Sequence, residues 1–250
     1  MEEQVLSAAE AAEFGEFKRV QREREIVLTL KKLVIDASRR ENDRAALKRA
    51  CESASHLGAS AIIVSPVNVV YTRKQLPKKE ERLPSLIATV GGTGESLIAV
   101  KKTEAKRALR QGADGIRLIP CNSALIAGEY NYIKREIKTV RKAVKRGILI
   151  VSLCDSAISE REITLGVKAA VAARADGVSV RGETELVLAA IEAAEGRVFA
   201  EADGVQNAVQ LKQLLRAGVL RAVTDRGEKL AQELRNSLNP AESVDNKEGL

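Results

Sequence analysis

The stretch Ala175-Asp-Gly-Val-Ser-Val-Arg-Gly-Glu183, written ADGVSVRGE, shows the unit from which the chain is built. It begins at the Gly-containing end of a helical pattern and continues as a short apolar run that is typical of a buried strand. The run stops at a polar tip that offers Ser179, Arg181 and Glu183. In α/β folds the ends of the strands are the usual place for a functional site. The sequence therefore directs attention to these tips.

Apolar, β-branched runs of the same kind recur along the chain, at residues 33–37, 61–65, 86–90, 115–120, 148–153, 177–180, 197–202 and 220–224. Helical patterns, with apolar residues three and four positions apart, lie between them. They occupy residues 43–56, 101–111, 130–146, 163–174, 183–195, 207–216 and 227–238. Strands that are apolar almost throughout indicate parallel pairing under a cover of helices.

This alternation predicts an α/β fold, a (β/α)8 TIM barrel, because closure of eight parallel strands leaves no exposed edge. An open doubly wound sheet is the competing architecture, but the Gly-rich first turn that is usual there does not follow the first run, LVIDA. We expect an N-terminal helical extension at residues 1–28, the barrel at 29–238 and a polar flexible tail at 239–250. The extension could plug the bottom of the barrel or meet a partner.

Composition limits the class of function. Aromatic residues make up 2% of the 250-residue chain, which argues against base stacking on single-stranded nucleic acid. The net charge of +7 arises from charges of both signs that are interspersed along the chain, which indicates a solvated surface. We therefore do not expect a nucleic-acid partner. No apolar run is long enough to cross a bilayer, and the acidic N-terminus lacks the features of a secretory signal. We expect a soluble cytoplasmic protein with no membrane association.

Cysteine and histidine offer little for metal or nucleophilic chemistry. Cys51, Cys121 and Cys154 share no close spacing, which disfavours a disulfide framework and fits a reducing compartment. Because the single histidine, His56, lies far along the chain from Cys121 and Cys154, a cysteine nucleophile with an adjacent base is not expected. The sequence predicts no metal and no cofactor.

One long segment resembles the middle of the deoxyribose-phosphate aldolase family. It consists of IATVGG at 87–92 and AVKKTEAKRALRQGADGIRLIPCNSALIAGEYNYIKREI at 99–137. Weaker likeness is found in LVIDAS at 33–38, VSP at 64–66 and ADGVQNAVQLKQLLRAG at 202–218, so the resemblance covers roughly residues 33–235. It implies a class I aldolase, in which a lysine on the sixth strand forms a Schiff base, assisted by a lysine on the seventh strand and an aspartate on the fourth, without a metal.

This sequence departs from the family at all three positions. The resemblance puts Ser179 in place of the Schiff-base lysine, Ala200 in place of the second lysine and Arg117 in place of the aspartate. A hydroxyl or a methyl group cannot form a Schiff base, and Arg is not a general base near neutral pH. No lysine occurs from Ala169 to Leu211, so retained activity would need one from elsewhere, such as Lys32 or Lys101.

The polar residues at the strand ends define a candidate pocket: Asp36, Arg117, Asn122, Cys154, Asp155, Ser179, Arg181, Asp203, Thr224 and Asp225. In one interpretation the arginines pair with the aspartates and fill a pocket that no longer admits substrate. The protein is then a non-catalytic pseudoenzyme, a binding or scaffolding subunit with a protein partner or as a homo-oligomer.

The alternative is an enzyme of altered lyase or aldolase-type chemistry on a small anionic carbonyl compound. There Asp155 or Asp203 acts as a base and Arg117 or Arg181 grips the anionic ligand. A divalent cation on Asp155, Asp203 and Asp225 is a poorer hypothesis, because arginines lie nearby. The basic stripe Lys134, Lys138, Lys142 and Lys145 could dock an acidic protein or a nucleic-acid backbone, although charge on the wet face of an outer helix is the simpler explanation.

Overall fold

A computed structural model of the protein describes residues 8–38, 43–77 and 84–237. Eight parallel strands close into a barrel in the order of the sequence. They are β1 (Leu33–Asp36), β2 (Ala61–Val64), β3 (Ser85–Val90), β4 (Gly115–Leu118), β5 (Ile148–Leu153), β6 (Gly177–Arg181), β7 (Phe199–Asp203) and β8 (Arg221–Thr224). The predicted (β/α)8 barrel is therefore confirmed, and the open sheet is excluded because β1 pairs with both β2 and β8.

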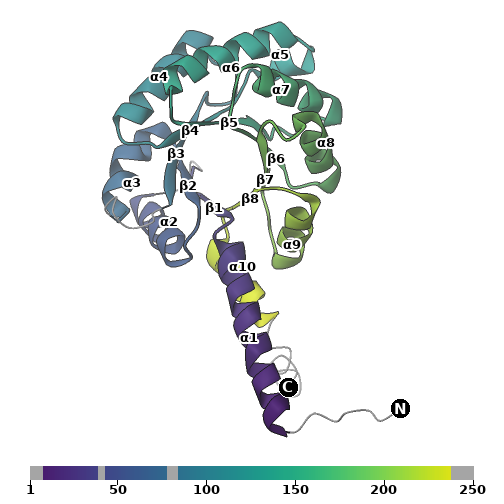
Figure 1. The fold of residues 1–250 in the computed structure, drawn as a ribbon. Coiled ribbons are helices and arrows are strands. Elements are labelled where there is room, and N and C mark those ends of the chain that lie inside the picture. The colour runs from purple at the N-terminus through teal and green to yellow at the C-terminus, as the bar shows by residue number, and fades with distance from the viewer. Residues whose placement is uncertain (1–7, 39–42, 78–83, 238–250) are drawn as a thin grey trace, which may run out of the picture.

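Helices surround the strands as an outer ring (Figure 1). They are α2 (Arg44–His56), α3 (Val69–Gln75), α4 (Ile98–Arg110), α5 (Asn122–Ile126), α6 (Tyr130–Val144), α7 (Glu160–Ala172), α8 (Thr184–Ala194), α9 (Ala208–Ala217) and α10 (Gly227–Asn236), with a 3-10 turn, η1 (Pro66–Asn68), before α3. All seven predicted barrel helices are present. The sequence patterns missed η1, α3 and α5, because elements of three, seven and five residues are too short to show a helical period.

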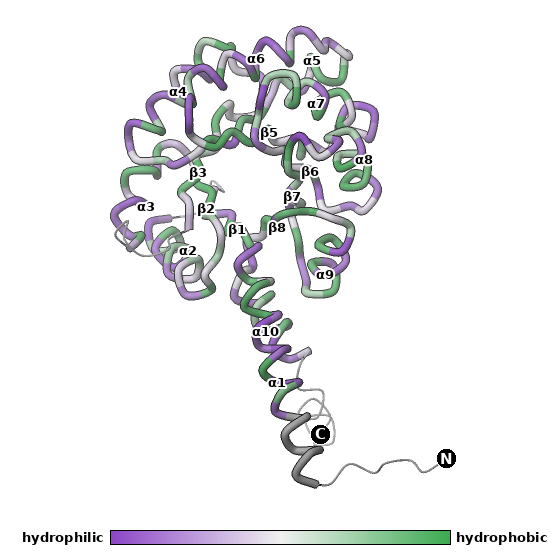
Figure 2. The backbone as a smooth tube through the Cα atoms, in the orientation of Figure 1, coloured by the Kyte–Doolittle hydropathy of each residue, from purple (hydrophilic) through white to green (hydrophobic). Residues whose placement is uncertain are grey.

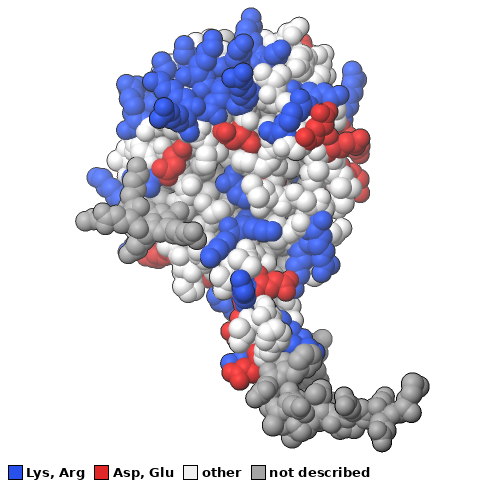
Figure 3. All heavy atoms as spheres, in the orientation of Figure 1, with Lys and Arg blue, Asp and Glu red and all other residues white. Residues whose placement is uncertain are grey.

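The buried apolar residues form two layers. Inside the barrel, Val34, Ile63, Ile87, Ile150 and Val223 belong to a small central cluster. The alternate residues of the same strands face outward and pack against the helices in a much larger cluster. The tube coloured by hydropathy shows the matching alternation of apolar and polar residues along the outer helices (Figure 2). Lysine and arginine gather over one sector of the outer surface (Figure 3).

Ahead of the barrel, α1 (Ala8–Leu30) extends the predicted N-terminal helix by two residues beyond position 28. It contacts α10 and projects away from the barrel instead of crossing its opening (Figure 1). Its last turns anchor it through the buried side chains of Ile26 and Leu30. The predicted tail at 239–250 lies outside the described residues, and the three-part division of the chain stays a prediction.

Candidate active site

Alternate residues of each strand point their side chains into the barrel. On β6, Val178 and Val180 belong to the outer apolar cluster, whereas the intervening Ser179 is fully buried inside. β6 pairs with β7 so that Ser179 lies opposite Glu201 and Arg181 lies opposite Asp203. Ser179 is therefore the deeper position and Arg181 the position at the mouth.

Arg117, from β4, crosses the interior and joins three strands. Its Nη2 atom forms a salt bridge with Asp203 Oδ2 of β7 and donates to Ser179 Oγ at 3.1 Å and to Cys154 Sγ at 3.4 Å. The arginine is 5% exposed. Burial alone would lower the pKa of Arg117, but the acidic groups around it, Asp203 first, leave that pKa above its ordinary value. The guanidinium thus stays charged.

A second ion pair lies one layer deeper. Glu201 of β7 is fully buried and accepts from Arg221 Nη2 of β8 at 2.9 Å. The Arg221 guanidinium also stacks 4.7 Å from the centre of the Phe199 ring. Burial is the main cause that raises the pKa of Glu201, against the lowering effect of Arg221 and Arg117. Sequence reasoning missed this pair, although both residues alternate with outward-facing neighbours.

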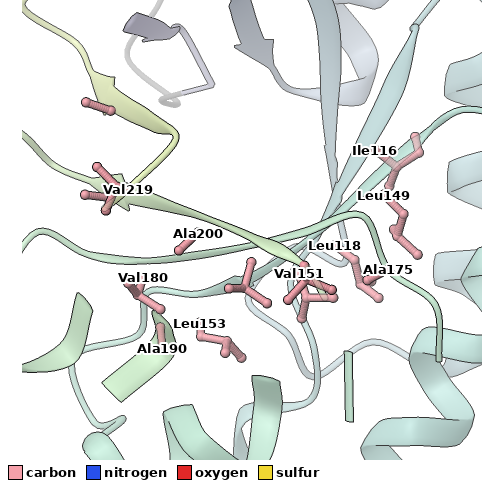
Figure 4. Close-up of a cluster of buried hydrophobic side chains, with 14 of the residues drawn as sticks. Ile116, Leu118, Leu149, Val151, Leu153, Ala175, Val180, Ala190, Ala200 and Val219 are labelled. Atoms are coloured by element: carbon pink, nitrogen blue, oxygen red, sulfur yellow. The ribbon is translucent and has the colours of Figure 1, made fainter. Parts of the chain in front are cut away.

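The assignment of Ala200 to the interior is wrong. Ala200 faces the helices and packs in the outer cluster near Val180, Ala190 and Val219 (Figure 4). Side chains alternate along a strand, so an error of one residue moves a position to the other face. The inward position of β7 at the level of Ser179 is Glu201.

The mouth is held by polar contacts that differ from those expected. Arg181 donates to the carbonyl oxygen of Asp155 and forms a salt bridge of 3.0 Å with Glu183, so it does not reach an aspartate side chain. Asn122, at the start of α5, donates to Asp155 Oδ2 at 3.0 Å. Of the expected pairings of Arg117 and Arg181 with aspartates, only that between Arg117 and Asp203 is present among the described residues.

The other three candidate residues lie at the ends of β1 and β8. Asp36 accepts from the backbone and hydroxyl of Ser38, at 2.9 and 2.7 Å. Thr224 is buried and donates to Val205 O at 2.8 Å. A cavity of about 510 Å³ lies beside them; its lining includes Asp36, Asp225 and the cations Arg49, Arg226 and Lys229, but neither Arg117 nor Ser179. The predicted pocket is thus divided into an interior cluster and a separate cavity.

Comparison with known proteins decides the family. The chain is 31% identical over 180 residues to the deoxyribose-phosphate aldolase of Nocardia farcinica, spanning 67% of this chain and 77% of that one. The chain belongs to the deoxyribose-phosphate aldolase family. An enzyme of the same name from Thermus thermophilus is 29% identical over 187 residues, which cover 72% of this chain and 84% of the relative. No protein-family model matches the chain.

Solved structures agree on the fold. The barrel superposes on an aldolase named QR15 with a TM-score of 0.76 and 22% identity, over 84% of this chain and 97% of that one. It also superposes on the tetrameric deoxyribose phosphate aldolase of Aeropyrum pernix with a TM-score of 0.70 and 17% identity, over 86% and 98% of the two chains.

The two lysines considered as substitutes for the family lysines do not reach the interior cluster. Lys101 of α4 is fully buried, and its Nζ atom donates to Glu136 Oε1, to Ile119 O at 3.0 Å and to Gly94 O, each at hydrogen-bonding distance. Lys32 precedes β1, so it lies at the amino ends of the strands, opposite the mouth. Lys101 thus ties the loops after β3 and β4 to α6.

The cysteines are free thiols. Burial, followed by the nearby charge of Asp203, raises the pKa of Cys154 from 9.0 to about 12. Its thiol donates to Ser179 O at 3.4 Å. A thiol protonated at neutral pH is a poor nucleophile, so Cys154 serves as a small packing residue.

Metal sites and membrane spans are both absent from the described part of the chain. Its His, Cys, Asp and Glu side chains do not come together in threes as a metal site would require. Asp155, Asp203 and Asp225, the candidates for a divalent cation, instead have separate protein partners. None of its helices combines the length and apolar character needed to span a membrane.

Proposed function

We propose that this member of the deoxyribose-phosphate aldolase family is a pseudoenzyme, a non-catalytic binding or scaffolding subunit of an assembly. The observation that carries the proposal is the content of the barrel interior. Ser179 stands on β6, and the space in front of it is occupied by the Arg117–Asp203 ion pair.

Class I aldolase chemistry needs an amine that can lose its proton. Arg117 remains a cation, and the Lys101 Nζ atom is engaged by the buried Glu136 side chain and by two backbone carbonyl oxygens away from the barrel interior. Ser179 cannot substitute, because its hydroxyl contacts the charged Arg117 and the protonated thiol of Cys154, and neither is a general base.

The same contacts oppose the alternative of an altered lyase. Such an enzyme would use Arg117 to grip an anionic substrate and Asp203 as a base, but the two neutralise each other inside the barrel. Arg181 is likewise committed to Glu183 and to backbone oxygens. The alternative would require both ion pairs to open, so we place it second.

The role in an assembly is supported by α1. Four large apolar side chains on this helix are about half exposed: Phe17, Val20, Val27 and Leu28. Large apolar side chains grouped on one projecting element are typical of a protein interface. We therefore propose the residues of the N-terminal extension as the assembly element, whether the partner is a second protein or another copy of this chain. Three free thiols fit the cytoplasmic location that we infer from the sequence.

The first experiment joins a chemical and an assembly test. The protein is incubated with deoxyribose 5-phosphate or acetaldehyde, reduced with borohydride, and analysed by mass spectrometry for a covalent adduct on any lysine. In parallel, affinity purification at native expression level and size exclusion identify what accompanies it. We expect no adduct, no aldehyde release and a stoichiometric complex, which removal of residues 1–25 reduces. A lysine adduct or turnover contradicts the loss of catalysis, and a free monomer carrying a small molecule contradicts the scaffold role.

A further inference from the structure

The positive charge of the molecule is concentrated in one sector. Residues 98–147 contain 13 Lys and Arg against 4 Asp and Glu, a surplus of nine. The rest of the chain contains 28 against 30, a deficit of two. The whole excess of +7 therefore belongs to one fifth of the sequence. The sequence pattern of mixed charges along most helices concealed this asymmetry.

The fold turns this segment into a single face. α4 and α6 pack side by side on the outside of the barrel, and blue side chains cover this region in Figure 3. We call it the basic face; its members, all exposed or half-buried, are Lys102, Lys106, Arg107, Arg110, Lys134, Arg135, Lys138, Lys142, Lys145 and Arg146. Within the described part of the chain, none of these ten forms a salt bridge.

The acidic residues of the same segment do not balance the basic face. Glu136 is buried against Lys101, and Asp114 is bound by Arg73. Glu104 accepts from the backbone nitrogen of Gly91 at 2.9 Å. Glu129, before α6, is the remaining acid. An ordinary solvated helix carries both signs on its outer surface, whereas here three of the four acids are buried or bonded elsewhere and Glu129 is exposed.

The basic face continues into a hollow. A cavity of about 690 Å³ lies between the last turns of α6 and α7, and its lining includes Lys138, Lys142, Lys145 and Arg174. Arg141 also lines it, while bonded to Asp176 at 2.7 Å. The cations thus surround a concave region as well as covering a convex one, which is suited to an extended anion.

We propose that the basic face binds the phosphodiester backbone of duplex nucleic acid. Protein interfaces are depleted in lysine and enriched in aromatic residues. The basic face is instead rich in lysine, and among the described residues of α4 and α6 only Val100 is a strongly exposed large apolar side chain. The two aromatic residues of α6, Tyr130 and Tyr132, are half-buried and lie against Lys134 and Arg135, so we expect the contact to be to phosphates and independent of base sequence.

The dimensions set the number of contacts. The 15 residues of α6 span about 22 Å, which corresponds to about six base pairs of duplex. About five phosphates would then be neutralised, so log K should fall with log salt with a slope of about −4.5. Raising the salt from about 50 to about 200 mM is expected to weaken binding by about 10²- to 10³-fold.

The test uses the full chain and labelled duplexes of DNA and of RNA, each of about 24 base pairs, with binding followed by fluorescence anisotropy over a series of salt concentrations. The variant K138E/K142E removes two cations of the basic face. Its matched control R216E/K229E makes the same charge change on exposed residues of α9 and α10, and both Lys142 and Arg216 lie in last helical turns. Circular dichroism confirms that both variants are folded.

We expect K138E/K142E to bind at least about 10-fold more weakly and to lower the salt slope by about 2, while R216E/K229E stays within about twofold of the unchanged protein. Failure of the unchanged protein to bind either duplex at about 50 mM salt overturns the proposal. Equal weakening by both variants also overturns it, because it indicates attraction by net charge alone. Tighter binding of a polyglutamate peptide than of either duplex assigns the face to an acidic protein instead. These outcomes are independent of the adduct test for catalysis.

Discussion

The ion pair between Arg117 and Asp203 can be tested by removing one charge at a time. Their side chains are 6% and 20% exposed, so the arginine is much the more deeply buried partner. At an effective dielectric constant of about 20, two charges about 4 Å apart interact by about 4 kcal/mol. Asp203→Asn keeps an acceptor oxygen but leaves a buried cation without its counter-charge. We expect it to lower the free energy of unfolding by about 3 to 4 kcal/mol.

Removing the other partner should cost less. Arg117→Met leaves an Asp203 carboxylate that water can partly reach, so we expect a loss of about 2 to 3 kcal/mol. The double variant leaves no unpaired charge, and its loss should be smaller than the sum of the two single losses by about 2 to 4 kcal/mol. The surface pair of Arg197 and Glu195, whose side chains are 54% and 66% exposed, provides the control; Arg197→Met should cost at most about 0.5 kcal/mol.

Urea unfolding followed by far-ultraviolet circular dichroism measures all four variants. For a chain of this size, the Asp203→Asn change should also lower Tm by roughly 6 to 16 °C. Losses below about 1 kcal/mol in both single variants, or strictly additive losses in the double variant, would refute the reasoning that Arg117 and Asp203 hold the interior closed as a coupled pair.

Three further predictions concern other buried groups. Lys101→Met should lower the free energy of unfolding by about 3 to 5 kcal/mol, because it leaves Glu136 as an unpaired buried carboxylate; a loss below about 1 kcal/mol in urea unfolding contradicts this. Since folding raises the pKa of Cys154 from 9.0 to about 12, stability that is complete below the lower value should fall as the pH rises between the two. Cys154→Ala should reduce the slope of the free energy of unfolding against pH by up to about 1.4 kcal/mol per pH unit. An unchanged slope would contradict the assignment of this pH dependence to the Cys154 thiol. Gly177→Ala should cost about 1 to 3 kcal/mol, because the added methyl group would lie 2.3 Å from the Phe199 ring, and an unchanged melting temperature counts against that packing.

The regular part of the fold was predictable because long elements repeat a simple pattern. Each of the eight strands lies within or beside its predicted run, and α6 and α10 have the expected apolar face. Helices α3 and α5 were missed because seven and five residues do not complete two helical turns. The path of α1 away from the barrel was also left open, since apolar periodicity does not show which surface a helix will contact.

The candidate site was predictable as a set of strand ends but not as a set of contacts. The family resemblance placed Ser179 correctly inside the barrel, whereas Ala200 was one residue out of phase and concealed Glu201. The strand VFAEAD puts its small apolar residues on one face and its acids on the other, and the usual preference for apolar residues in a core does not predict that the acids point into the barrel. Likewise, the sequence does not distinguish Lys101 from the other charged residues of α4, because its burial depends on pairing with Glu136 of α6.

Charge balance explains how a polar barrel interior can be stable without a substrate. Arg117 and Arg221 enter from β4 and β8, and both acids, Glu201 and Asp203, come from β7. Two cations therefore meet two carboxylates, and no net charge is buried. A lysine at the position of Ser179 would add a third cation close to the Arg117 guanidinium, as the present 3.1 Å contact indicates. Because of the nearby guanidinium, this lysine would favour its neutral amine form. The amine would still have no space to receive a substrate while the Arg117–Asp203 pair remained. In the proposed pseudoenzyme, an amine at position 179 and the Arg117–Asp203 pair would therefore compete for the same interior space.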